Sequence, residues 1–115
     1  RDEEKQEKMR SELSNSRLKF YIGDVRNYDS IHQALKGAHY VFHAAALKQV
    51  PSCEFYPIEA VRTNVLGGEN VISASLANNV KKVIVASSHV VLAGNHPLRI
   101  SKITVENYCK LYINL

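Results

Sequence analysis

The sequence predicts an α/β fold with a parallel sheet flanked by helices. Short apolar segments typical of strands alternate along the 115 residues with segments of helical period. Strands that alternate with helices in this way are joined by right-handed crossovers and run parallel in one sheet. The last strand candidate, Lys82–Ala86, is mostly β-branched and apolar, as is typical of a parallel strand buried on both faces.

The first half of the chain predicts a helix, a strand, a short helix and a second strand. Residues 1–14 contain no Gly or Pro and are mostly charged, which is typical of a surface helix. Leu18–Ile22 has the composition of a strand. Asp29 is a plausible N-cap for a short helix that Gly37 ends, because glycine adopts the left-handed conformation without strain. His39–His43 is the second strand candidate.

The second half predicts two helices, one on either side of the third strand. We expect a loop after Pro51, and then a long helix over Pro57–Asn78 with its proline in the first turn. Gly67-Gly68 lies inside this helix at a cost of about 1 kcal/mol per glycine relative to alanine, so a neighbouring strand or helix should approach closely there. We expect a loop over His89–Arg99 and a last helix over Ile100–Ile113. That helix has four large side chains available for packing: Ile103, Tyr108, Leu111 and Tyr112.

Composition and charge argue against several classes of protein. The net charge is +4, but the lysines and arginines are scattered among acids and form no basic patch, so we expect no nucleic-acid partner. No apolar run approaches the ~20 residues that span a membrane, and the chain does not open with a signal pattern, so we expect no membrane association. Because the chain begins with Arg1 and not Met, we expect a segment to precede it.

The cysteines and histidines predict neither a disulfide nor a metal site. Cys53 and Cys109 are far apart and belong to no CxxC motif, so we expect two reduced thiols in a cytoplasmic protein. The five histidines have no metal-ligand spacing. His43, at the end of the second strand, is more typical of a packed, hydrogen-bonded imidazole than of a general base.

Three predicted strand ends should meet at one edge of the sheet. In a parallel sheet, Gly23-Asp24, Ala44–Lys48 and Ser87–His89 lie on the side where open α/β sheets bind their ligands. The alanine run, Ala44-Ala45-Ala46, lets a flat or bulky group lie against the backbone, and Lys48 places a positive charge just beyond it. A small-residue packing contact between strand and helix explains the alanines about equally well.

The polar residues at this edge each have two interpretations. Asp24 could accept hydrogen bonds from an adenine or a ribose, or it could cap a turn. Asn64 faces the strand ends if the long helix packs on the sheet, or it satisfies a nearby backbone carbonyl. Ser87 and Ser88 are more typical of turns than of catalysis when considered alone. Gly67-Gly68 lies inside a helix, so it is not the glycine-rich turn after a strand that a dinucleotide site needs.

Four segments carry a resemblance to a known family: Phe20–Arg26 (FYIGDVR), His43–Pro51 (HAAALKQVP), Ser52–Pro57 (SCEFYP) and Thr63–Gly67 (TNVLG). Together they resemble the UDP-N-acetylglucosamine 4,6-dehydratases, extended short-chain dehydrogenase/reductase enzymes of bacterial capsule and surface-polysaccharide synthesis. The run from Pro51 to Pro57 is most similar to the branch that also inverts C5, the dehydratase/5-epimerases. The resemblance extends over Arg1–Ser87 and implies part of a Rossmann-like domain.

The resemblance implies a site for NAD or NADP and a UDP-sugar at the strand ends. Asp24-Val25 would hold the adenine, and Arg1-Asp2 would touch the adenosine ribose. The alanine run would leave room for ribose and pyrophosphate, Lys48 would reach toward nucleotide or sugar, and Asn64 would order the strand-end network. The other residues implied are Ser87 and Lys102 for the cofactor, and Ser88, His89 and Lys102 for catalysis.

The resemblance also implies a reaction and an assembly. In the family, bound NAD(P)+ takes a hydride from C4 of the hexose, the ketone acidifies C5–H, water leaves from C6, and the hydride returns to C6. The complete protein would be a homo-oligomer. Relative to the family, this chain lacks the amino-terminal strand with its glycine-rich turn and the carboxyl-terminal substrate domain, so it corresponds to a partial NAD(P)-binding domain over residues 1–115.

The catalytic segment departs from the family pattern. The family has Ser-Thr-Asp-Lys-Ala after its strand and then a Tyr or Met four residues before a Lys. The spacing of fifteen from Ser87 to Lys102 is kept, but His89 stands at the acid, Val90 at the lysine and Leu98 at the Tyr or Met. Elimination needs a positioned proton donor and acceptor, and valine is neither. We therefore expect this chain to be inactive by itself; a non-catalytic Rossmann-like binding or assembly module is the alternative.

Overall fold

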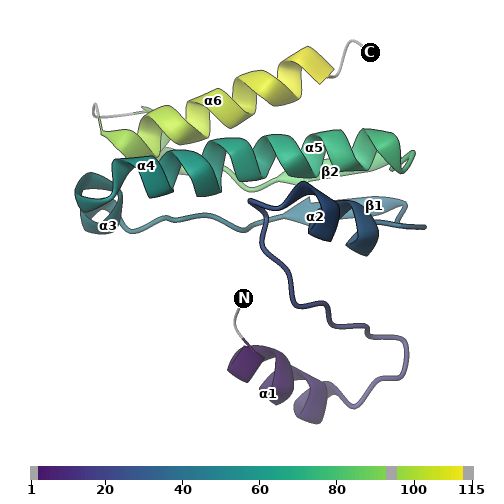
Figure 1. Ribbon diagram of the computed structural model, residues 1–115. Helices are drawn as coiled ribbons and strands as arrows, with labels where there is room; N and C mark the ends of the chain where they lie inside the picture. Colours follow the sequence, from purple (N-terminus) through teal and green to yellow (C-terminus); the bar gives the residue numbers. More distant parts are fainter. Residues whose placement is uncertain (1–2, 93–95, 113–115) are drawn as a thin grey trace.

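The computed structural model describes residues 3–92 and 96–112, which form a two-stranded parallel sheet with helices packed on it (Figure 1). The elements in chain order are α1 (Glu3–Leu13), α2 (Tyr28–Ala34), β1 (Tyr40–His43), α3 (Val50–Phe55), α4 (Pro57–Ala60), the π-helix η1 (Val61–Leu66), α5 (Gly67–Ala77), β2 (Lys82–Val85), the 3₁₀ helix η2 (His89–Leu92) and α6 (Pro97–Tyr112). Helix α5 contacts α6, β1 and α2, whereas α1 lies apart from the rest at the end of an extended segment. The α/β class with a parallel sheet agrees with the prediction.

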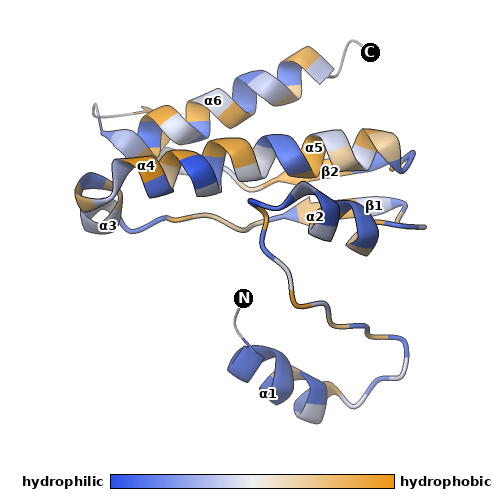
Figure 2. Cartoon of the chain, in the orientation of Figure 1, coloured by the Kyte–Doolittle hydropathy of each residue, from blue (hydrophilic) through white to orange (hydrophobic). Residues whose placement is uncertain are grey.

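Strands β1 and β2 pair in parallel, as predicted. Their register places Val41 beside Val83 and Phe42 beside Ile84. Because alternate side chains of a strand point to opposite faces, Phe42 and Ile84 share one face, where they are 70% and 50% exposed. Figure 2 shows β2 coloured mostly as hydrophobic. One face of the sheet is therefore apolar and open in the part of the chain that the structure describes.

The prediction of a strand over Leu18–Ile22 is wrong. This segment has no ladder partner among the described residues, and Tyr21 and Ile22 are exposed. In the common doubly wound order 3-2-1-4-5-6, the third strand lies three places from the fourth, with strands 1 and 2 between them. If Leu18–Ile22 corresponds to the third strand and β1 to the fourth, the two cannot pair directly. Its composition suits a strand, but a strand forms only against a neighbour.

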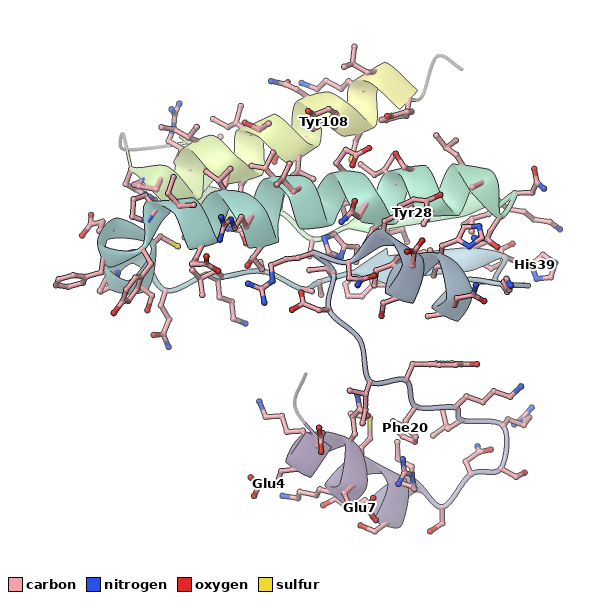
Figure 3. All side chains as sticks on the ribbon, in the orientation of Figure 1. Glu4, Glu7, Phe20, Tyr28, His39 and Tyr108 are labelled. Atoms are coloured by element: carbon pink, nitrogen blue, oxygen red, sulfur yellow. The ribbon has the colours of Figure 1, made fainter. Side chains whose placement is uncertain are left out.

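Helix α1 confirms the predicted surface helix and makes few contacts. Figure 2 shows it as almost wholly hydrophilic, and Figure 3 shows Glu4 and Glu7 on it. The guanidinium of Arg10 lies 5.3 Å from the ring centre of Phe20, a cation–π contact. The side chain of Gln6 donates a hydrogen bond to the carbonyl of Tyr21. These two contacts attach the helix to the extended segment that follows it.

Helix α2 begins two residues earlier than predicted. The N-cap is Asn27, not Asp29, because the Asn27 side chain accepts a hydrogen bond from the backbone N–H of Ser30 at 3.0 Å. Asp29 instead lies in the first turn, where a negative charge favours the helix dipole. Gly37 has a φ of +76°, which confirms the predicted left-handed stop.

The loop predicted after Pro51 is a helix, α3. Pro51 lies in its first turn, where the missing N–H of proline costs nothing. The helix buries Cys53, which packs with Ala60, Leu98 and the half-buried Leu47 in a small core. Burial of this thiol explains why a short segment with little helical period still forms a helix.

The long helix predicted from Pro57 is present but contains a turn that the sequence pattern does not show. Residues 61–66 form the π-helix η1 between α4 and α5. The glycines confirm the predicted close approaches: a Cβ on Gly67 would lie 2.7 Å from the Val25 side chain, and one on Gly68 would lie 2.9 Å from the Val105 side chain. Both glycines are therefore required by their neighbours.

Helix α6 begins earlier than predicted, and its most buried residues precede most of the predicted ones. It starts at Pro97 instead of Ile100, with a proline in the first turn, and residues 89–92 of the expected loop are 3₁₀ helix. Its buried residues are Leu98, Ser101 and Val105. Leu111 is exposed, contrary to the prediction, and Ile113 lies outside the described residues. The i, i+3, i+7 spacing of the buried set is that of one helical face.

Candidate functional site

Asn64 joins the segment after β1 to helix α6. Its side chain is buried, and its Oδ1 accepts a hydrogen bond from the backbone N–H of Leu47 at 2.7 Å. Its Nδ2 donates to the carbonyl of Leu47 at 2.8 Å and to Ser101 Oγ at 3.0 Å. One amide thus satisfies both backbone groups of the residue that follows the alanine run. Asn64 lies in the π-helix, and such turns are frequent at functional sites.

Lys102 follows Ser101 and lies at the end of β2. Its Nζ donates a hydrogen bond to the carbonyl of Ala86 at 2.9 Å. Burial lowers the pKa of Lys102 because it disfavours the ammonium ion; Glu106 opposes this effect and the positive charge of Lys48 adds to it. The Lys102 ammonium therefore lies at the carboxyl end of β2, beside the Ala86 carbonyl.

His43 is the last residue of β1 and is buried near Lys102. Burial lowers the pKa of its imidazole, and the charge of Lys102 lowers it further. The neutral ring is therefore favoured, which suits a packed imidazole more than a charged one. The backbone hydrogen bonds between the two strands extend to the His43 carbonyl, which accepts from the N–H of Ala86 at 2.9 Å.

A cavity of about 390 Å³ lies between β2 and α6. Its lining includes Ser87, Lys102 and Glu106, and the Ser87 hydroxyl is hydrogen-bonded to the Glu106 carboxylate. A hydroxyl, an ammonium and a carboxylate therefore share one wall. The arrangement presents both a donor and an acceptor to a bound polyol such as a sugar or a ribose.

The alanine run leaves the backbone beyond β1 accessible. Ala44 and Ala45 are exposed and Ala46 is half-buried, while Lys48 is exposed. The residue that follows the run, Leu47, is held to the helix through the Asn64 side chain. This edge could thus accept a flat group against its backbone.

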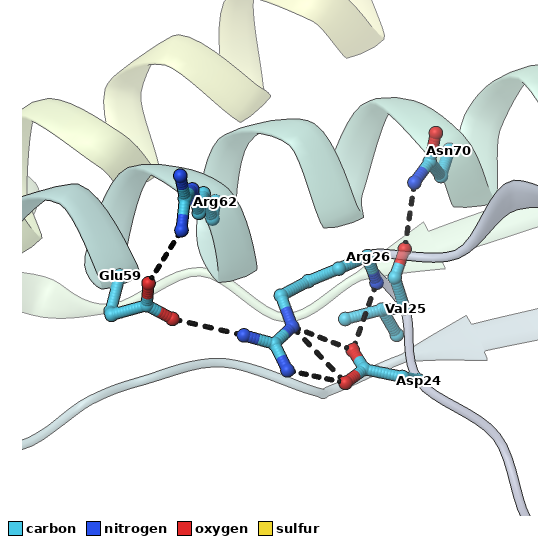
Figure 4. A network of polar contacts seen from close by, with 6 residues as sticks. All are labelled: Asp24, Val25, Arg26, Glu59, Arg62 and Asn70. Carbon is cyan, nitrogen blue, oxygen red and sulfur yellow. Dashed lines mark hydrogen bonds and ion pairs between the residues drawn. The ribbon is translucent and has the colours of Figure 1, made fainter.

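Asp24 lies in a separate network of ion pairs (Figure 4). Its carboxylate accepts from the backbone N–H of Arg26 at 3.0 Å, as in a capped turn, and forms an ion pair with the Arg26 guanidinium at 2.7 Å. Arg26 also pairs with Glu59 at 2.9 Å, and Glu59 pairs with Arg62 at 3.0 Å. The hydrogen bond and charge of Asp24, followed by Glu59, raise the pKa of Arg26. Asp24 therefore caps a turn, which is the second of its two predicted roles.

The remaining predicted residues fall into three groups. Ser88 is half-buried, and its carbonyl accepts from the N–H of Val91 at 3.2 Å. The side chains of His89 and Val90 lie outside the described part of the structure, as do Arg1 and Asp2. Leu98, at the family's Tyr or Met position, is buried in the core with Cys53 and Ala60.

The structure brings Asn64 and Lys102 together at the end of β2 through Ser101 and the Ala86 carbonyl, and it places Asp24 in the separate network of Arg26 and Glu59. Sequence reasoning missed Ser101, which receives the Asn64 hydrogen bond, and Glu106, which holds Ser87. Ser101 directly precedes Lys102, and Glu106 follows it by one helical turn. Helical spacing of the residues around Lys102 could have identified both Ser101 and Glu106 from the sequence.

The described residues include neither a metal-binding cluster nor a membrane-spanning helix. Residues 3–92 and 96–112 contain no group of three or more His, Cys, Asp or Glu placed to hold a metal ion. Over the same ranges, no helix has the length and apolar character to cross a membrane.

Comparison with known proteins identifies similar chains. The UDP-glucose 4-epimerase of Rickettsia akari is 61% identical over 106 residues, which are 92% of this chain and 31% of that protein. Among solved structures, Pen from Bacillus thuringiensis superposes with a TM-score of 0.90 at 40% identity over 94% of this chain and 34% of that chain. MoeE5, in complex with UDP-glucose and NAD, superposes with a TM-score of 0.66 at 31% identity over 74% of this chain and 32% of that chain.

The similarity to these proteins covers between 74% and 94% of this chain. The chain spans about 31% of the length of the curated relatives it matches. The polysaccharide biosynthesis protein family, in turn, matches residues 1–113. Two further solved structures, at 23% and 21% identity, superpose with TM-scores of 0.79 and 0.86 and share the fold. The chain belongs to the polysaccharide biosynthesis protein family.

Proposed function

We propose that this chain is the central part of a sugar-nucleotide enzyme, and specifically of a UDP-N-acetylglucosamine 4,6-dehydratase/5-epimerase that uses NAD or NADP. The observation that carries the proposal is the Asn64 link. It fixes the backbone beyond the alanine run and, through Ser101, the start of the helical turn that carries Lys102. The link therefore fixes the position of the alanine run relative to the Lys102 ammonium. Both lie at the ends of parallel strands, where such folds bind nucleotides.

The residues present fit one end of a dinucleotide. Ala44 and Ala45 are exposed, so a ribose or pyrophosphate meets no side chain beyond Cβ. The Lys102 ammonium, held at the Ala86 carbonyl, can donate to the hydroxyls of a nicotinamide ribose. MoeE5, a structural neighbour with NAD and UDP-glucose bound, supports the same pair of ligands here. The bound nicotinamide would supply the hydride acceptor for C4 of the sugar.

The chain's own residues would divide the work as follows. Asp24 and Val25 hold the adenine, and Asn64 keeps Leu47 and Ser101 in place. Lys48 reaches toward the nucleotide or sugar, while Ser87 and Lys102 orient the ribose. Ser88 and His89 align with the Thr and Asp of the Ser-Thr-Asp-Lys-Ala segment that moves protons in the family. Because Val90 can neither donate nor accept a proton, elimination would be slow in this chain even with a complete cofactor site.

Epimerisation at C4 is a second candidate function. The 61% identical relative in Rickettsia akari is a UDP-glucose 4-epimerase. Both reactions begin with oxidation at C4, and they differ in whether water then leaves from C6. A non-catalytic Rossmann-like module is a third candidate, favoured by the altered segment after Ser88. A cytoplasmic, homo-oligomeric complete protein is part of the first proposal.

The experiment is a chimera in which this chain replaces the matching 106 residues of the Rickettsia akari enzyme. It is incubated with NAD+ or NADP+ and either UDP-N-acetylglucosamine or UDP-glucose. We expect little turnover from the unmodified chimera, and recovery of a 4-keto-6-deoxy sugar nucleotide when His89→Asp and Val90→Lys are introduced together. Each general acid or base contributes about 10²–10⁴-fold, so the recovery should be large. Formation of UDP-galactose instead would favour the epimerase.

The isolated chain provides a second test. It has no glycine-rich turn at a helix N-terminus, which is what usually holds the pyrophosphate. Titration calorimetry should therefore detect weak dinucleotide binding or none. Micromolar affinity would mean that another part of this chain holds the pyrophosphate.

A further inference from the structure

The segment Asp24–Arg26 is held in place by the long helix and by no strand pairing among the described residues. The Arg26 guanidinium donates to both oxygens of Asp24, from Nε at 3.0 and 3.1 Å and from the terminal nitrogen at 2.7 Å. Its other terminal nitrogen donates to Glu59 on α4 at 2.9 Å. One planar group therefore fixes the Asp24 carboxylate relative to the helix (Figure 4).

The neighbouring residue, Val25, is held by α5, about two and three helical turns beyond Glu59. Asn70 Nδ2 donates to the carbonyl of Val25 at 2.9 Å. The Val25 side chain lies so close to Gly67 that an added Cβ would approach to 2.7 Å. The backbone and side chain of Val25 are thus both positioned by α5.

We propose that Glu59 is a positioning residue for adenine recognition, acting through Arg26 on the carboxylate of Asp24. The proposal rests on the proposed function, in which Asp24-Val25 holds the adenine. Glu59 touches no base itself; it sets the plane of the guanidinium, and the guanidinium sets the direction of the carboxylate oxygens. The side chains of Asp24 and Arg26 remain 27% and 33% exposed, so the carboxylate can still be reached from solvent.

The chemistry of the base makes the direction important. Adenine presents an exocyclic amino group, which can donate to a carboxylate, whereas hypoxanthine presents a carbonyl at the same position, which a carboxylate repels. A carboxylate held at the right angle discriminates between the two bases. A carboxylate that turns with a loosened arginine discriminates less, even when the rest of the site is intact.

The test compares Glu59→Gln with Arg62→Gln. Both changes remove one charge from the same network, but only the first removes the anion that orients Arg26. In the isolated chain, Glu59→Gln should speed hydrogen exchange at the Arg26 Nε–H, measured by NMR, while Arg62→Gln leaves it unchanged. Equal rates in the two variants would overturn the link between Glu59 and Asp24.

The second measurement is base selectivity in the chimera that contains this chain. Dissociation constants are measured for NAD+ and for nicotinamide hypoxanthine dinucleotide. Glu59→Gln should lower the preference for NAD+ by a factor of about two to five, the effect of one half-exposed ion pair, with Arg62→Gln matching the unmodified chimera. A merely structural role would weaken both dinucleotides equally, and that result would overturn the proposal.

The proposed function and this inference fail in different ways. If the unmodified chimera binds neither dinucleotide, the nucleotide site itself is wrong, and the exchange measurement on the isolated chain still decides whether Glu59 positions Asp24. If the chimera prefers NAD+ and Glu59→Gln keeps that preference, the site stands and the positioning role of Glu59 is refuted.

Discussion

At the scale of single residues, Asn64 shows how one buried amide can determine the shape of a loop. It is 3% exposed, and all of its partners lie on other elements. A buried polar group is tolerated only when it is hydrogen-bonded, and Asn64 satisfies the Leu47 backbone as well as itself. The sequence could place Asn64 near the strand ends, but not choose between a ligand contact and a backbone contact, because both use the same amide.

Replacing Asn64 with alanine should destabilise the fold. The change leaves the N–H of Leu47 without its partner and the carbonyl with only the Cys53 thiol at 3.5 Å, at a cost of about 1–3 kcal/mol for the N–H. Urea unfolding followed by circular dichroism measures this as a lower midpoint at unchanged slope. The matched control is Asn107→Ala on the exposed side of α6, which should stay within about 0.5 kcal/mol of the unmodified chain. Equal midpoints for the two variants would contradict the role of Asn64.

His43 should make stability depend on pH. Its pKa is lowered in the fold, so the unfolded chain takes up a proton more readily and the folded state is penalised in acid. The free energy of unfolding should be fully present above the ordinary histidine value of 6.5 and fall as the pH drops below it. Denaturant titrations between about pH 8 and pH 5 measure the slope. His43→Gln should flatten it, and an unchanged slope in that variant would assign the acid sensitivity to other groups.

At the scale of elements, two different segments lie very close to the long helix, one at Gly67 and one at Gly68. The glycine pair predicted that something lies near, since glycine inside a helix needs a reason. The partners, a loop residue for Gly67 and a helix residue for Gly68, could not be predicted because they depend on how distant segments pack. Helix α3 was not predicted for a similar reason. Its six residues are helical because Cys53 packs against Ala60 and Leu98, and Leu98 is distant in the sequence.

Gly68→Ala should destabilise the contact between α5 and α6 despite the better helix propensity of alanine. The added methyl meets Val105 at 2.9 Å, and overpacking of this kind costs about 1–3 kcal/mol, more than the propensity gain of about 1 kcal/mol. Val105→Ala in the same chain should recover part of the loss, since it removes the atoms that clash. A thermodynamic cycle over the two single variants and the double variant should give a coupling of about 1 kcal/mol or more. Additive effects would show that the two residues do not press on each other.

At the scale of the whole molecule, the sheet is buried on one face and open on the other in the described residues. The prediction of a parallel sheet came from local patterns and is confirmed for β1 and β2. The third predicted strand failed because pairing is non-local: Leu18–Ile22 has the right composition but no neighbouring strand in the described part of the chain. The fold class was therefore predictable from the sequence, whereas the number of paired strands was not.

The open face should make the isolated chain self-associate. Phe42 and Ile84 form an apolar patch next to strand edges that have no partner among residues 3–92 and 96–112, and such edges promote pairing between chains. Sedimentation velocity at increasing concentration should show association, and Phe42→Lys should reduce it. Phe55→Lys is the control, because Phe55 is 81% exposed but lies on α3, away from the sheet. Equal reductions by both substitutions would point to general charge repulsion in place of a sheet contact.

The π-helix η1 also sets the phase of the helix that follows it. The backbone N–H of Gly67 bonds to the carbonyl of Arg62, five residues back instead of four, so one extra residue is accommodated in the turn. Each residue of an α-helix accounts for about 100° of rotation, so removing one residue from Val61–Leu66 would turn α5 by about that angle relative to α4. Gly67 and Gly68 would then face away from Val25 and Val105, and a methyl-bearing residue would take their place. The number of residues in η1 therefore determines which residues of α5 face Val25 and Val105. A one-residue deletion within Val61–Leu66 should destabilise the fold more than many substitutions there.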